Sequence, residues 1–367
     1  MVDIGEISYS SFNSNFLNML LPLRYMQHAT LFSIFTIQNN RIKTHSTRYY
    51  IGAFIGVLGF ITCRLVIKIE DLYYKNFSLV IRIINNNISF SWVLILITFF
   101  FINFLKRHHY VGMVLRIQRS FKELNYKHYL RITIWNWFVV LAHLIFLVYV
   151  VFVFLEIKKI FIALSFIGFD IHITVSILFL NLIREGFVTW ISDVKDYSKY
   201  FHHEEGQYNE RMKIMFRVYL DLMGAFDLFK SIYQFVCFFL TVDIYFFSLL
   251  FLQEVIEIHI NHIPDDEHMA VSFWILKRSV FMVLFCSLCE KFYMTVSEAD
   301  GLCSSLLNSF QDIVAMKRLC KNVQRLNRAA FNKMTVCHIL TVDGRLPQEF
   351  CSYLFGHLIV LLQFTIL

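Results

Sequence analysis

Long apolar runs separated by basic segments dominate this sequence. Seven mostly apolar stretches stand out, at 48–68, 88–105, 132–154, 160–183, 229–252, 271–288 and 350–367. Runs of about 20 such residues cross the hydrocarbon core of a bilayer as a helix. The pattern therefore predicts an all-α polytopic membrane protein with seven transmembrane helices, the sixth of which is interrupted by Lys277 and Arg278.

Lys and Arg are unevenly distributed among the segments that join these runs. They are abundant before the first run and between the second and third, the fourth and fifth, and the sixth and seventh, whereas the segment after the fifth run is acidic. Because Lys and Arg stay on the cytoplasmic side, the N-terminus is expected inside the cell and the C-terminus outside. This topology divides the chain into a cytoplasmic N-terminal segment (1–47), a six-helix bundle with cytoplasmic anchor helices (48–347) and a seventh helix (348–367).

Two basic segments also contain apolar residues at helical spacing. Examples are Met215, Val218 and Leu222 in one segment and Leu306, Phe310, Ile313 and Val314 in the other. Such spacing predicts amphipathic helices that extend the spans into the cytoplasm.

The composition excludes several classes of protein. Hydrophobic residues make up 57% of the chain and charged residues 17%, which excludes a disordered chain. The eight cysteines lie mostly in apolar runs or a basic segment, so no disulfide framework is expected. The first residues lack the pattern of a signal peptide, and we expect insertion to begin at a mature span. The two Asn-x-Ser/Thr sequons, at Asn76 and Asn87, fall in the first external loop of this topology and are compatible with glycosylation.

Constellations typical of enzymes are lacking. There is no phosphate-cradling glycine loop, and Cys286-x-x-Cys289 lacks a second pair of ligands. The loop at 257–268 holds three histidines and several carboxylates, which suits either Zn²⁺ or, more simply, a solvated acidic turn. We therefore predict no enzymatic activity, no metal, no cofactor and no nucleic-acid partner; the net charge of +7 follows from membrane orientation.

Ionisable and aromatic residues occur in the external halves of the predicted spans. Ionisable groups are costly in a membrane and usually face a cavity or a partner. One interpretation is a pocket for a small amphipathic organic molecule; the other is that Asp170 or Asp243 pairs with Lys277 or Arg278 while the aromatic rings pack as core or lipid-facing residues. The candidate ligand-binding residues are His143, Tyr149, Asp170, Asp243, Tyr245, Trp274 and Lys277.

The last run carries a motif. Residues 356–364 read Gly-His, five apolar residues and then Gln363-Phe364. This resembles the C-terminal signature of insect gustatory receptors, Thr-Tyr, five apolar residues and Gln-Phe, with Gly356 and His357 in place of Thr and Tyr. The stretch 337–343 is similar to the family's Gly-x-Phe-x-apolar-Asp, with His338 and Leu340 as departures, and 20–25 is similar to the family's start.

The resemblance implies a tastant-gated, non-selective cation channel in the plasma membrane of chemosensory neurons. It implies a homo- or hetero-tetramer in which the seventh helix of each subunit lines the pore, and Val360, Gln363 and Phe364 fall on one stripe that is suited to a gate. The same stripe also suits packing against neighbouring helices. An alternative function is a secondary transporter of a small organic solute that uses the intramembrane charges. A G-protein-coupled receptor is disfavoured because the predicted topology is reversed.

Overall fold

The chain is almost entirely helical. A computed structural model describes residues 14–29, 33–38, 41–70, 79–154, 157–199, 205–261, 268–309, 313–336 and 340–366. These residues form α1 (Ser14–Ala29), α2 (Thr47–Glu70), α3 (Leu79–Leu105), α4 (Arg107–Glu123), α5 (Tyr129–Phe154), α6 (Ile157–Lys199), α7 (Glu205–Asn261), α8 (His268–Ser309), α9 (Val314–Ala330) and α10 (Leu346–Ile366). Two small antiparallel hairpins pair β1 (Thr36–Gln38) with β2 (Arg41–Lys43) and β3 (Thr335–Val336) with β4 (Leu340–Thr341).

The described residues of each of the seven predicted runs lie in a helix, namely α2, α3, α5, α6, α7, α8 and α10. Within the described residues, three helical segments are long and apolar enough to cross a membrane: Phe169–Lys199, Tyr208–Leu252 and Ile275–Ser309. A fourth is added if α3 and α4, which bend by 63° at their junction, form one broken span. The described parts of α2 and α5 are shorter apolar helices. The fold is thus consistent with an all-α membrane protein, while the count of seven spans and their orientation stay predictions.

Three helices are much longer than the apolar runs within them. α6, α7 and α8 have 43, 57 and 42 residues, so α7 alone extends about 85 Å. The predicted extension of the fifth span is confirmed, because Met215, Val218 and Leu222 are buried in the same helix as that span. The second extension is not continuous: Leu306 lies in α8, Ile313 lies between helices and Val314 begins α9.

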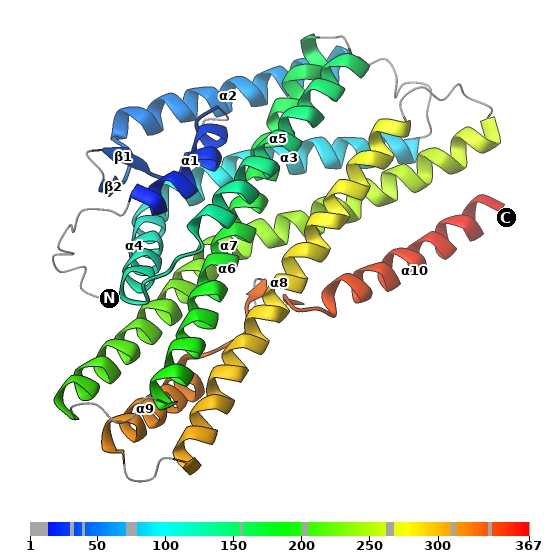
Figure 1. The fold of residues 1–367 in the computed structure, drawn as a ribbon. Coiled ribbons are helices and arrows are strands. Elements are labelled where there is room, and N and C mark those ends of the chain that lie inside the picture. The colour runs from blue at the N-terminus through cyan, green and yellow to red at the C-terminus, as the bar shows by residue number, and fades with distance from the viewer. Residues whose placement is uncertain are drawn as a thin grey trace.

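The polar ends of the long helices meet at what we call the basic end, formed by α4, α9 and the adjoining ends of α6, α7 and α8 (Figure 1). Side chains join its helices. Arg119 of α4 pairs with Asp221 of α7 at 3.1 Å. The Trp190 indole of α6 donates a hydrogen bond to the Met215 carbonyl oxygen of α7 at 2.9 Å. These contacts make the basic end a tightly packed helical body.

The N-terminal helix packs on the bundle. Phe16 of α1 meets Phe121 of α4 edge-on at 6.2 Å between ring centroids. Asn136 of α5 donates a hydrogen bond to the Met19 carbonyl oxygen at 2.7 Å. This hydrogen bond, buried in the α1–α5 contact, fixes the position of α1 along α5.

The C-terminal helix contrasts with the rest, since α10 runs beside α7 and α8 and stands clear of the other helices (Figure 1). Phe350, Leu354 and Leu358 form a half-buried stripe toward the bundle. Tyr353 is 67% exposed, and most other described side chains of this helix are exposed too. A helix of this apolar character needs lipid or another protein chain on its exposed faces.

Candidate functional site

A buried guanidinium lies between two carboxylates where α6, α7 and α8 converge. Arg278 of α8 is only 1% exposed. Its Nε lies 3.1 Å from an oxygen of Asp170 on α6, and its Nη1 lies 3.0 Å from an oxygen of Asp243 on α7. One side chain of α8 thereby links the two helices that flank it.

A second cation completes the cluster. Lys277, the preceding residue of α8, contacts the other oxygen of Asp170 at 2.5 Å. The two cations balance the two carboxylates, so the cluster is formally neutral. Neutrality matters because a single uncompensated charge in a low-dielectric interior costs several kcal/mol.

Aromatic rings surround the charges. The Arg278 guanidinium lies 4.1 Å from the centroid of the Phe169 ring and 5.5 Å from that of Trp92 on α3. Phe99 stacks on Phe169 at 5.3 Å between centroids. Cation–π attraction adds to the ion pairs here, and the rings keep water away from them.

Neutral polar groups connect this region to the α3–α4 bend. Tyr110 of α4 donates a hydrogen bond to Asn103 of α3 at 3.1 Å, and the Asn103 amide lies 3.5 Å from His172 of α6. All three residues are buried. The chain of contacts holds the bend against α6 at His172, two residues from Asp170.

The structure brings together some of the predicted ligand-binding residues and separates others. Asp170, Asp243 and Lys277 join in the ion-pair cluster, as one of the two interpretations anticipated. His143 of α5 lies beside α8, where its ring stacks on Phe281 with the centroids 6.1 Å apart.

Tyr245 lies elsewhere, facing His357 of α10 at 5.5 Å between centroids. The side chains of Tyr149 and Trp274 lie outside the described part of the structure, although both residues belong to helices. Tyr245 therefore belongs to the α7–α10 contact and not to the surroundings of Asp243.

The predicted gate residues lie near the free end of α10. Val360 is 46% exposed and Gln363 is also exposed, both away from the half-buried stripe. The side chain of Phe364 is not among those described. Val360 and Gln363 thus make little contact with the rest of the chain that the structure describes.

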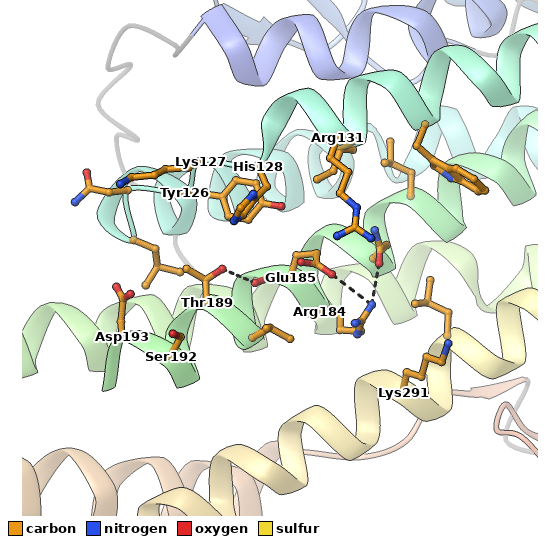
Figure 2. A pocket seen from close by; sticks show the side chains of 18 of the residues that line it. Tyr126, Lys127, His128, Arg131, Arg184, Glu185, Thr189, Ser192, Asp193 and Lys291 are labelled. Atoms are coloured by element: carbon orange, nitrogen blue, oxygen red, sulfur yellow. Dashed lines mark hydrogen bonds and ion pairs between the residues drawn. The ribbon is translucent and has the colours of Figure 1, made fainter. Parts of the chain in front are cut away.

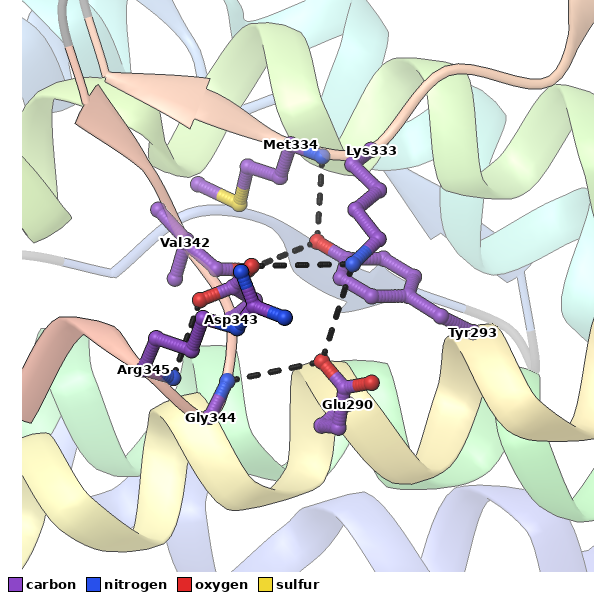
Figure 3. Close-up of polar contacts among 8 residues, drawn as sticks. All are labelled: Glu290, Tyr293, Lys333, Met334, Val342, Asp343, Gly344 and Arg345. Atoms are coloured by element: carbon purple, nitrogen blue, oxygen red, sulfur yellow. Dashed lines mark hydrogen bonds and ion pairs between the residues drawn. The ribbon is translucent and has the colours of Figure 1, made fainter.

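A polar junction fastens α8 to the segment that precedes α10 (Figure 3). The Tyr293 hydroxyl of α8 accepts a hydrogen bond from the Met334 backbone N–H at 3.0 Å and donates one to the Val342 carbonyl oxygen at 2.9 Å. Met334 and Val342 are also joined to each other, because the Val342 N–H donates to the Met334 carbonyl oxygen at 2.9 Å. One hydroxyl therefore closes the base of the β3–β4 hairpin.

Charges surround that hydroxyl. Lys333 lies 3.8 Å from Glu290 and 3.6 Å from Asp343, and its ammonium is 5.2 Å from the centroid of the Tyr293 ring. The Gly344 N–H donates to Glu290 at 3.4 Å. We call these residues, with Tyr293, the α8–α10 junction.

Sequence reasoning missed the α8–α10 junction. The stretch 337–343 stood out only through the resemblance, and nothing local marks Tyr293 or Glu290 as its partners across more than 40 residues. Of the predicted glycosylation residues, Asn76 lies outside the described residues, and Asn87 lies within α3 with its side chain undescribed. Of the predicted loop at 257–268, residues 257–261 belong to α7 and His268 begins α8, so the loop was predicted too long, and 262–267 lie outside the described residues. Among the residues described, no cluster of His, Cys, Asp or Glu is arranged to hold a metal ion.

Comparison with known proteins adds no family assignment. The chain matches none of the protein-family models, and a search of the curated proteins gives no match.

Proposed function

We propose that this protein is a tastant-gated, non-selective cation channel of the gustatory receptor type, located in the plasma membrane of chemosensory neurons. Four copies, identical or related, surround a central pore lined by α10. The proposal rests on the C-terminal resemblance to that family. It draws support from the all-α fold and from the helices that are long enough to cross a membrane.

The observation that carries the proposal is the exposure of α10. This helix of 21 residues touches α7 and α8 along one stripe only, and its remaining described faces are open. Gln363 lies on an open face within an apolar helix. A polar amide on such a face is better satisfied by neighbouring copies of the helix, or by water in a pore, than by lipid tails.

The proposed ligand acts through α8. This helix carries Lys277 and Arg278 at one level and Glu290 and Tyr293 about 22 Å farther along. A tastant that binds near the ion-pair cluster and prefers one arrangement of α6, α7 and α8 would shift α8, and the junction would carry that shift to the base of α10. Binding then favours the open pore by its differential affinity for the two states.

Current recording tests the pore. Cells that express the wild type or Gln363→Ala are compared at matched surface abundance, with Gln348→Ala in the first turn of α10 as the control. We expect Gln363→Ala to change ion permeability or basal current and Gln348→Ala to leave both unchanged. If Gln363→Ala conducts like the wild type at normal surface expression, the pore assignment is wrong.

The topology has its own test. Antibody access to tags at the two ends, before and after permeabilisation, should show a hidden N-terminus and an exposed C-terminus. The opposite result would remove the channel proposal. The buried charges also suit a secondary transporter, and saturable solute uptake without channel currents would favour that function.

A further inference from the structure

A groove opens between α5 and α8 over the face of α6, away from the ion-pair cluster. Its volume is about 1480 Å³, and its walls come from the α4–α5 turn, α5, α6 and α8. Figure 2 shows Arg131 extending from α5 toward α6 and Lys291 extending from α8 toward α6. Toward the far end of α5, the ring contact between His143 and Phe281 brings α5 and α8 together.

The lining changes from charged to apolar at one level on all three helices. On α5, Arg131 is followed on the same face by Trp135 and Phe138; on α8, Lys291 is preceded by Leu288 and Leu284. On α6, Arg184 lies two turns from Ile177. Three separate helices thus pass from a charged to an apolar surface over about 10 Å, with cations on α5 and α8 and charges of both signs on α6, which is the change found at a membrane surface.

The charges of the groove are not balanced within it. Each acidic lining residue has its own cation: Glu185 pairs with Arg184 at 3.4 Å, Asp193 with Arg211 at 3.5 Å, and Asp196 with Lys199 at 3.3 Å. Lys127, Arg131 and Lys291 form no ion pair with any carboxylate in the described parts of the chain. Three positive charges therefore face the groove without a protein counter-ion.

The apolar side chains that line the groove are also exposed. Trp135 is 55% exposed, Phe138 60% and Leu284 50%. These side chains line a concave surface, not a flat one, so they can enclose an elongated apolar chain. The groove presents apolar wall and cationic rim together, which complements the two parts of an anionic lipid.

We propose that the α5–α6–α8 groove binds an anionic phospholipid of the cytoplasmic leaflet. The phosphate and headgroup lie among Lys127, Arg131 and Lys291, and an acyl chain runs along Trp135, Phe138 and Leu284. Basic pockets between helices on the cytoplasmic side suit such headgroups because that leaflet is rich in anionic lipid. The inference rests on membrane insertion and on the predicted orientation, not on ion conduction.

Lipid retention on the full-length protein tests the proposal. The protein is purified in mild detergent, incubated with phosphatidylserine, phosphatidylinositol 4-phosphate or phosphatidylcholine, and examined by native mass spectrometry and thermal unfolding. We expect the two anionic lipids to be retained and to raise Tm, and phosphatidylcholine to do neither. Equal retention of phosphatidylcholine would overturn the proposal.

Charge variants supply the matched comparison. Arg131→Gln/Lys291→Gln should lower retention of anionic lipid by roughly tenfold or more. Lys317→Gln/Arg325→Gln removes the same charge from exposed positions of α9 and should retain lipid like the wild type. Wild-type retention by the groove variant, or an equal loss by both variants, counts against the groove.

Two further experiments use the wild-type protein alone, so they do not depend on how the variants fold. A photoactivatable phosphatidylserine should form adducts on α5 and α8 near the groove, and adducts confined to other helices would refute the site. Glycerol phosphate, which has no acyl chain, should not displace the lipid at matched concentration; displacement would identify a soluble anion as the occupant.

Discussion

Tyr293 of α8 donates a hydrogen bond to the Val342 carbonyl oxygen at 2.9 Å, four residues before α10 begins. The same hydroxyl accepts the Met334 N–H, so its removal leaves two buried backbone groups without this partner. The contact joins the helix that carries the buried charges to the helix proposed to line the pore. A single side-chain oxygen therefore offers a way to test whether the two regions act together.

Tyr293→Phe should lower stability by about 1–2 kcal/mol, because a buried donor and acceptor lose their partner while the ring volume is kept. In the channel it should also reduce the current at saturating ligand, since α8 and α10 are joined more loosely. Thermal unfolding in detergent measures the first effect and current recording the second. Tyr197→Phe, on an exposed ring of α6, is the control. A fully functional, fully stable Tyr293→Phe protein would contradict the proposed coupling.

Arg278→Met should be strongly destabilising, by about 3–5 kcal/mol, because it removes the guanidinium that contacts both Asp170 and Asp243 and leaves this buried cluster with a net negative charge. Adding Asp243→Asn should restore much of the loss, since the second change makes the cluster formally neutral again. A double-mutant cycle of unfolding free energies measures the coupling. Additive effects of the two substitutions would show that the Arg278–Asp243 contact contributes little.

Three helical glycines should respond to alanine in an order set by what lies beside them. A Cβ at Gly186 would lie 2.6 Å from the Leu222 side chain and 3.3 Å from Phe121 in the packed interior, so Gly186→Ala should cost about 1–3 kcal/mol. A Cβ at Gly224 would come still closer to Arg116, but it would meet the end of a flexible side chain that can turn away.

Gly224→Ala should therefore be milder than Gly186→Ala. A Cβ at Gly301 of α8 would meet no atom within 4 Å, so Gly301→Ala should stabilise the helix by about 0.5–1 kcal/mol. Thermal unfolding of the three variants under one set of conditions gives the order. If Gly224→Ala were the most harmful, Arg116 would be shown to hold its position rigidly.

The packing of the N-terminal segment should weaken in mild acid. Burial lowers the pKa of His45 from 6.5 to about 4, and the nearby charges of His28 and Arg24 act in the same direction. The unfolded segment takes up a proton below pH 6.5 while the packed segment resists it, so stability is full above that pH and falls as the pH drops toward 4.

Amide hydrogen exchange in α1 and in the first turn of α2, at pH 7 and pH 5, follows this change. In His45→Gln the difference in protection between the two pH values should shrink, because one of two titrating histidines is gone, while the neighbouring His28, whose pKa burial also lowers, remains. His128→Gln, at an exposed position, should behave like the wild type. A pH response that His45→Gln leaves unchanged would point to another group.

Much of the fold is local and could be predicted. Each apolar run forms a helix because, in lipid, the backbone N–H and C=O groups of a single segment can form hydrogen bonds only with each other. The helices extend farther than hydropathy indicates because α6, α7 and α8 continue into polar sequence, where burial against α4 and α9 stabilises them. Windows of mean hydropathy do not detect such extensions, whereas amphipathic spacing indicates them, as at Met215, Val218 and Leu222 in α7 and at Leu306 in α8.

The candidate site could be predicted in part. Asp170, Asp243 and Lys277 were recognisable because ionisable groups in apolar runs require partners. The grouping of Asp243 with Tyr245 was avoidable, since residues two apart on a helix point in different directions. The structure bears this out, with Asp243 facing Arg278 and Tyr245 facing α10.

The order of residues along the chain is enough to predict the helical class, the positions of the apolar helices and the presence of charges within them, because hydrophobicity and backbone hydrogen bonding act over neighbouring residues. The packing of whole helices, by contrast, makes Arg278 join two carboxylates, makes Tyr293 close a hairpin more than 40 residues away and places the charged parts of three helices around one groove. Those relationships depend on how whole helices rotate and cross. Many residues of each helix contribute to that choice together, and no short stretch encodes it.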